Sequence, residues 1–178
     1  MSTQHPAALS TKLPSSTHIA IATARFNAAL TDELLAGCLR RLDELGISEK
    51  QITSVRVPGA FELPVTARAF ADTGRYDAII CLGAVVRGDT PHFDYVAGEC
   101  ARGLQNVATG LALPVIFGVL TTNTQKQAEE RTGGKHGHNG ERAAEAAVEM
   151  ISVLHSITNP PRTPAPARPK RPKSPKKR

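Results

Sequence analysis

His92 is the side chain of this sequence best suited to proton transfer near neutral pH, and other charged residues stand beside it in the chain. Arg87 and Asp89 precede it, and Thr90 with Pro91 predicts a helix start. Because a helix N-terminus attracts anions, the stretch favours acid–base chemistry on an anionic substrate. The same residue types are also typical of an ordinary solvated turn.

Two further charged residues stand at positions where the chain is restricted or flexible. Glu62 lies between Pro58 and Pro64, and a carboxylate held there could accept hydrogen bonds from a polar heterocycle, or only charge a helix N-terminus. Arg131 precedes the glycine-rich residues 133–140. Its planar guanidinium could clamp a phosphate, or only charge the C-terminal end of a short helix.

Metal and nucleotide chemistry find little support in the sequence. His136 and His138 could join His92 in a zinc site, but they lack the helical spacing or carboxylate partner that such sites use. The sequence contains no recognisable phosphate-binding P-loop, dinucleotide-binding motif or Ser-His-Asp arrangement. We therefore expect no metal site.

The elements that must position these residues alternate between short apolar strands and helices. We expect strands at residues 18–23, 52–57, 76–82 and 114–120, and helices at 31–45, 63–72, 91–111, 124–131 and 139–155. This alternation predicts a three-layer α/β/α domain with a doubly wound, parallel four-stranded sheet. Ligands of such sheets bind outside the carboxyl ends of the strands, where Phe26, the 58–62 turn, the 84–92 loop and Phe117 stand. Phe26 and Phe117, each taken alone, are typical of core aromatics.

Composition divides the 178 residues into three parts: an extended N-terminal arm at 1–16, one domain at 17–157 and a basic tail at 158–178. No apolar run is long enough to span a bilayer, and the N-terminus has no signal pattern. Cys38, Cys81 and Cys100 lie in apolar segments, which favours buried free thiols in a reducing cytoplasm.

The tail explains the high net charge. Of the 22 Lys and Arg residues, eight lie in residues 160–178 without any acid, so the overall charge of +6 leaves −2 on residues 1–159. Seven prolines and no apolar residue larger than Ala predict a segment without a packed structure. Its charges could attract polyanions weakly, or the segment could have no partner.

Four stretches of the sequence together carry a resemblance to a known family: ARFN at 24–27, VPGAFELP at 57–64, GAVVRGDTPHFDY at 83–95 and FGVLTTNT at 117–124. They resemble the lumazine synthase (6,7-dimethyl-8-ribityllumazine synthase) family, and the resemblance covers about residues 16–156. It implies a flavodoxin-like fold and a transferase of riboflavin synthesis that needs no cofactor. That enzyme condenses 5-amino-6-ribitylaminouracil with 3,4-dihydroxy-2-butanone 4-phosphate to give the lumazine, phosphate and water.

The resemblance also implies a role for each matching residue. His92 would transfer protons, and Phe26 would stack on the pyrimidine. The ring and ribityl chain would be bound by Ala60, Phe61 and Glu62, in a pocket lined by Ala84, Val85, Val86 and Phe117. The phosphorylated substrate would be held by Asp89, Thr90 and Arg131. One departure is Asn139, which stands where family members often carry a second lysine of this loop.

The family also implies homo-oligomers, pentamers with sites between neighbouring subunits, which in some members form a sixty-subunit shell. Residues 133–140 carry no insertion, which favours the shell. Two other functions stay open: a non-catalytic relative that binds a flavin or lumazine, and a nucleic-acid-binding module driven by the tail.

Overall fold

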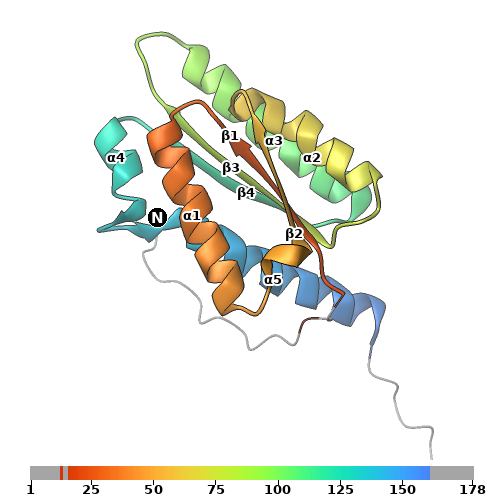
Figure 1. Ribbon diagram of the computed structural model, residues 1–178. Helices are drawn as coiled ribbons and strands as arrows, with labels where there is room; N and C mark the ends of the chain where they lie inside the picture. The colour runs from red at the N-terminus through yellow and green to blue at the C-terminus, as the bar shows by residue number, and fades with distance from the viewer. Residues whose placement is uncertain (1–12, 14–15, 161–178) are drawn as a thin grey trace, which may run out of the picture.

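A four-stranded parallel sheet lies at the centre of the computed structural model, which describes Leu13 and residues 16–160. Its strands are β1 (Ile19–Ala24), β2 (Ile52–Val57), β3 (Ala78–Val86) and β4 (Val115–Thr122), in the order β2-β1-β3-β4. This order begins as the flavodoxin-like order does. Helices α2 (Leu63–Asp72) and α3 (His92–Leu111) cover one face, and α1 (Ala28–Glu44) and α5 (Asn139–Thr158) cover the other (Figure 1). The predicted three-layer α/β fold is confirmed.

The alternation of side chains along the strands creates two separate cores. In β1, Ile19 and Ile21 pack with α1 and α5, whereas Ala20 and Ala22 face α2 and α3. Both central strands, β1 and β3, are buried on both faces, as their continuous apolar sequences require. Because the four strands are parallel, their carboxyl ends meet at a single edge of the sheet.

Helices α1 and α3 begin at other residues than predicted. Helix α1 begins at Ala28 rather than near Thr31, because Asn27 adopts the left-handed conformation (φ 59°, ψ 48°) and turns the chain into the helix earlier. Thr31 is consequently a buried helical residue. Helix α3 begins at His92, and Pro91 occupies the capping position expected for Thr90.

Strand β3 also runs further than predicted, through residues 83–86. Its register with β4 continues from Gly83 opposite Val119 to Val86 opposite Thr122, so backbone pairing extends into the glycine-bearing stretch. The residues expected in a loop before position 87 are thus held by the sheet.

The segment between β4 and α5 contains a small hairpin that the sequence did not indicate. Helix α4 spans only Gln125–Glu129, and the glycine-rich stretch forms β5 (Thr132–Gly134) and β6 (Gly137–His138). Helix α5 then extends to Thr158, three residues beyond the predicted end.

Cys38, Cys81 and Cys100 are buried free thiols, as predicted. Burial raises the pKa of Cys38 to about 12 and that of Cys100 to about 11. None of the helices in the described part of the chain is long and apolar enough to cross a membrane. The N-terminal arm, except Leu13 and Ser16, and the basic tail beyond Pro160 lie outside the described residues.

Candidate active site

The turns that follow β1 and β2 are tied to each other by backbone hydrogen bonds. The Arg25 amide donates to the carbonyl of Val57 at 2.8 Å, and the Phe26 amide donates to that of Pro58 at 3.1 Å. The Phe26 ring is left 70% exposed, so it is not the core aromatic that its position alone would suggest. It stands at the edge where ligands of such sheets bind.

Asn27 fixes the same turn to the third strand. Its left-handed backbone is one that Asn adopts more readily than most residues. Its Nδ2 donates to the carbonyl of Ala84 at 2.9 Å. The ends of β1, β2 and β3 are thus joined around Phe26.

The turn after β2 presents a carboxylate at the same edge. A single 3₁₀ turn, Ala60–Glu62, leads into α2, and Oε2 of Glu62 accepts the Gly59 amide at 2.8 Å. Ala60 is buried, whereas the Phe61 side chain is 57% exposed. Glu62 does not cap α2 with its side chain, and its second oxygen has no hydrogen-bond partner among the described residues.

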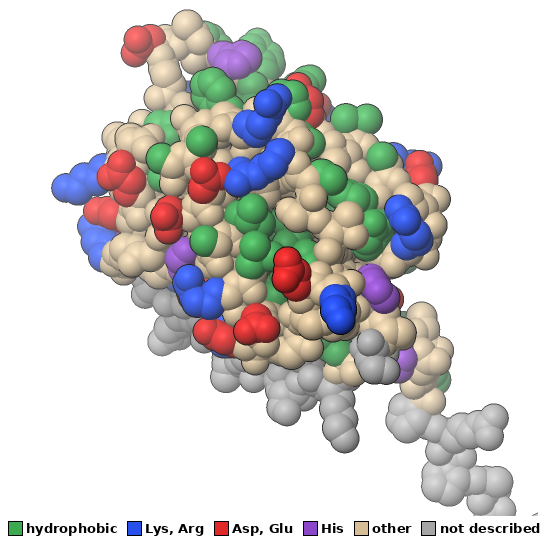
Figure 2. Space-filling view, in the orientation of Figure 1, with side chains coloured by type: hydrophobic (Ala, Val, Ile, Leu, Met, Phe, Trp, Pro, Cys, Tyr) green, Lys and Arg blue, Asp and Glu red, His purple; other side chains and the backbone are tan. Residues whose placement is uncertain are grey.

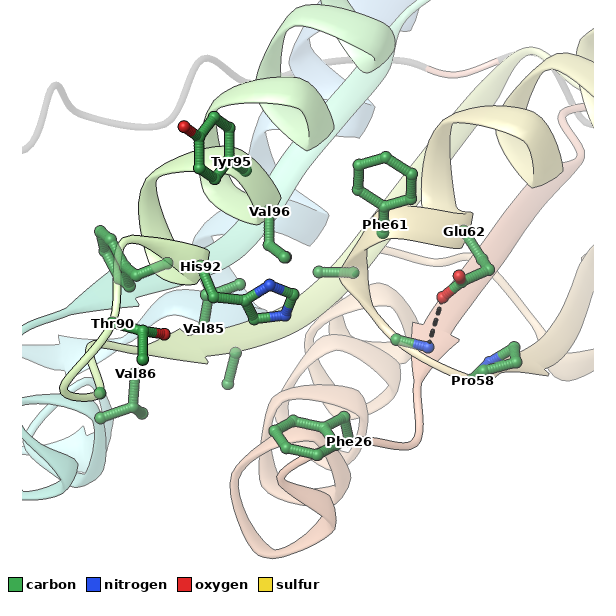
Figure 3. Close-up of a pocket in the computed structure, with 15 residues that line it drawn as sticks. Phe26, Pro58, Phe61, Glu62, Val85, Val86, Thr90, His92, Tyr95 and Val96 are labelled. Carbon is green, nitrogen blue, oxygen red and sulfur yellow. Dashed lines mark hydrogen bonds between the residues drawn. The ribbon is translucent and has the colours of Figure 1, made fainter.

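The third strand and α3 complete the site. Figure 3 shows the His92 imidazole pointing from the start of α3 toward the side of the site that carries Glu62. In this view Phe26 and Phe61 lie on opposite sides of the imidazole, and Thr90 lies beyond the start of the helix.

These residues enclose one cavity of about 670 Å³, within the size range of small-molecule sites. We call it the strand-end cavity. Its lining consists of Phe26, Pro58, Gly59, Ala60, Phe61, Glu62, Ala84, Val85, Val86, Gly88, Thr90, His92, Phe93, Tyr95 and Val96. Nine of the twelve residues predicted for the site are among them. Aromatic and aliphatic walls with one imidazole and one carboxylate suit a flat polar ring that undergoes proton transfer.

Three predicted residues do not line the strand-end cavity. Asp89 is exposed in the loop between two residues that do. Phe117 was expected at the carboxyl end of its strand, but it is the third residue of β4, which lies next to β3 and away from β1 and β2. Its side chain is 43% exposed. Arg131 follows α4, and its Nη1 donates to the carbonyl of Gln127 at 2.7 Å.

The lining also contains residues that sequence reasoning did not assign to it. Tyr95 and Val96 follow His92 by three and four positions in α3, so all three share one face of the helix. That spacing is the signal by which both could have been found.

Arg87 is not part of this lining. Its Nη2 and Nη1 donate to the two carboxylate oxygens of Asp94 at 2.7 and 3.1 Å. These hydrogen bonds, supported by the charge of Arg87, lower the pKa of Asp94 below its ordinary value. The bond between them joins the end of β3 to the first turn of α3.

The histidines considered for zinc are engaged elsewhere. His136 pairs with Glu130 at 3.6 Å between Nε2 and Oε2, and Nδ1 of the buried His138 accepts the Gly140 amide at 3.2 Å. No three His, Cys, Asp or Glu side chains within Leu13 and residues 16–160 are grouped as metal ligands would be.

Comparisons with known proteins give a family for this arrangement. A family model described as 6,7-dimethyl-8-ribityllumazine synthase matches residues 16–155, which include all strands and the whole lining of the strand-end cavity. A 6,7-dimethyl-8-ribityllumazine synthase of Edwardsiella ictaluri (strain 93-146) is 53% identical over 123 residues, which cover 68% of this chain and 79% of the relative. The chain belongs to the 6,7-dimethyl-8-ribityllumazine synthase family.

Proposed function

We propose that this protein condenses 5-amino-6-ribitylaminouracil with 3,4-dihydroxy-2-butanone 4-phosphate, forming 6,7-dimethyl-8-ribityllumazine, phosphate and water. The observation that carries the proposal is the meeting of His92, Glu62 and Phe26 in one cavity of a chain of this family. Imine formation, phosphate loss, ring closure and dehydration all require proton transfer near neutral pH, which an imidazole can provide.

The cavity suggests how the uracil substrate would be held. Phe26 offers an exposed ring on which a pyrimidine can stack, Phe61 and Glu62 lie across the cavity from it, and Ala60 also lines the cavity. The Gly59 amide fixes the Glu62 carboxylate through one oxygen, so the other can accept hydrogen bonds from the ring or the ribityl chain. Holding both substrates in register would itself lower the barrier.

The phosphorylated substrate would bind at the other end, near Thr90 and Asp89. Arg131 is the cation proposed for its phosphate, yet it does not line the cavity of its own chain. We propose that a neighbouring copy supplies Arg131 and Phe117, in a pentamer with sites between subunits. The exposure of Phe26 and Phe61 at the cavity, and of Phe117 on the outer strand β4, supports contact with a partner.

The larger assembly is a separate proposal. The hairpin of residues 132–138 is short and carries no insertion, which favours twelve pentamers in a sixty-subunit shell. Sedimentation tests it: a particle of sixty subunits is expected, and free pentamers or monomers would contradict the shell. The buried free thiols Cys38, Cys81 and Cys100 favour the cytoplasm as the compartment.

Two rival functions remain to be separated by experiment. A non-catalytic relative would bind a lumazine or flavin in the same cavity, but it would have no need of His92. A nucleic-acid-binding module would depend on the tail, which is outside the described residues. On the face in Figure 2, Lys and Arg side chains are interspersed with Asp and Glu and form no basic patch.

The deciding experiment mixes both substrates with the protein and follows the appearance of lumazine absorbance. We expect turnover that requires both substrates and no added metal or cofactor. Tight lumazine binding without turnover would instead support the non-catalytic alternative.

A further inference from the structure

The guanidinium of Arg87 connects the ends of three elements beside the strand-end cavity. It bonds to both carboxylate oxygens of Asp94 in α3, and its Nε donates to Oδ1 of Asn123, directly after β4, at 3.2 Å. Its Cζ lies 4.1 Å from the ring centroid of Phe93. The Arg87 amide itself donates to the carbonyl of Thr122 at 2.9 Å. The residue therefore restrains the first turn of α3 in distance and in direction.

Stability alone is a weak explanation for this arrangement. The side chains of Arg87 and Asp94 are 40% and 58% exposed, and exposed ion pairs contribute little to the free energy of unfolding. A planar, two-bonded contact combined with stacking on an aromatic ring nevertheless defines orientation well. We therefore expect the Arg87 contact to act on the position of the first turn of α3.

The turn of α3 that Arg87 restrains carries His92. It is the first residue of α3, directly before Phe93 and two positions before Asp94. Its imidazole makes no hydrogen bond to other side chains or backbone groups in the described residues, and residues 88–90 before it are exposed. His92 is itself exposed, so the position from which its ring reaches the cavity depends on where the first turn of α3 is held.

We propose that Arg87 is a positioning residue, which directs the His92 imidazole into the strand-end cavity by clamping the first turn of α3 to the ends of β3 and β4. The inference rests on the proposed function, because it concerns the proton transfer assigned to His92. Arg87 itself does not line the cavity and has no contact with substrate in this scheme.

A double-mutant cycle on kcat tests the connection between the two residues. Arg87→Ala, His92→Ala and the double variant are compared with the wild-type protein in lumazine formation. We expect Arg87→Ala to lower kcat on the order of 10-fold, short of the roughly 10²-fold cost of a full 1 Å displacement. In the His92→Ala background the same change should alter kcat by no more than about twofold, the scatter of independent effects.

The Michaelis constants and a matched control add a second readout. The KM for the uracil should change by no more than about twofold in Arg87→Ala, since the side chains proposed for its ring stand after β1 and β2. Arg68→Ala is the control, because Arg68 forms a comparably exposed ion pair with Asp72 in α2, with 2.7 Å between Nε and Oδ1. It should leave kcat unchanged.

The same double-mutant cycle is made with Asp94→Asn, which removes the charge of the other partner in the ion pair. This second cycle tests the positioning role if Arg87→Ala fails to fold. An equal loss of kcat in both His92 backgrounds, or a kcat of Arg87→Ala within about twofold of wild type, would overturn the positioning role alone. Absence of turnover by the wild-type protein would overturn the proposed function and the inference with it.

Discussion

Replacing Phe26 with alanine should weaken binding of the uracil substrate and leave the fold nearly intact. The ring is 70% exposed, so less than a third of the roughly 1.5–3 kcal/mol gained by burying a whole Phe side chain is at stake, under about 1 kcal/mol. Stacking of a base on an aromatic ring, by contrast, is worth about 1–3 kcal/mol. The binding constant should therefore fall by roughly 5- to 150-fold.

Two substitutions separate stacking from simple contact with an apolar surface. Phe26→Tyr keeps the ring and should bind the uracil about as well as wild type, whereas Phe26→Leu keeps apolar area but loses the π face. Isothermal titration with the uracil alone measures affinity without turnover, and thermal unfolding of each variant reports on the fold.

Either of two results would contradict the stacking role of Phe26. One is a folded Phe26→Ala variant whose affinity for the uracil stays within about twofold of wild type. The other is equal affinity of Phe26→Leu and Phe26→Tyr, which would assign the contact to buried area and remove the stacking role.

Four further predictions concern the proposed chemistry, the clamp on α3 and the tail. His92→Ala should lower kcat roughly 10²-fold in steady-state assays, and an unchanged kcat would remove His92 from the mechanism. Arg131→Ala should raise the KM for the butanone phosphate far more than the KM for the uracil, since it deletes a charge-assisted contact, and equal increases would count against the phosphate assignment. Hydrogen bonds from Arg87 lower the pKa of Asp94 in the folded state. The stabilisation by this pair is therefore complete above the unfolded-state pKa of about 3.9, and it is lost as the pH falls through the lower folded-state pKa. Amide exchange of residues 88–96, corrected for its intrinsic pH dependence, should therefore keep the same protection between pH 7 and 5, and loss of protection in that range would contradict the assignment. Deleting residues 160–178 should leave turnover intact and abolish any binding of RNA or DNA seen at low salt; loss of turnover would show that the tail reaches the site, and equal binding by both forms would exclude the tail as a nucleic-acid-binding arm.

The sequence located those elements whose ends are marked by residues with strong backbone preferences. Strand β2 and helix α2 have the predicted bounds, and Pro58 with Gly59 separates them. The start of α1 was misplaced because Asn27, not Thr31, turns the chain, and its left-handed conformation depends on the bond to Ala84 in a distant strand. Such a contact leaves no local pattern.

Strand pairing also explains two of the other differences. The end of β3 is set by its pairing with β4, which continues past Gly83, a residue that reads locally as the start of a loop. The hairpin of residues 132–138 rests on two residue pairs among several glycines, too few for any periodicity to appear.

The site was predictable to the extent that strand topology determines it. The rule that ligands bind beyond the carboxyl ends of parallel strands correctly grouped Phe26, Glu62 and His92. The same rule was wrong for Phe117, which was expected at the carboxyl end of β4 but is the third residue of that strand and pairs with Cys81 in the middle of β3. Strand β4 is also the outer strand, beyond β3, which places Phe117 further from the ends of β1 and β2.

The hydrogen bonds that join the ends of β1, β2 and β3 have a consequence for how this protein would recognise its ligand. They form between groups of the protein itself, through Phe26 and Asn27, so this side of the cavity is already shaped before any ligand arrives. A preformed surface loses little conformational entropy when it is filled, and more of the contact energy then remains as affinity. The free and loaded forms should accordingly superimpose around Phe26, with association limited by encounter and not by rearrangement.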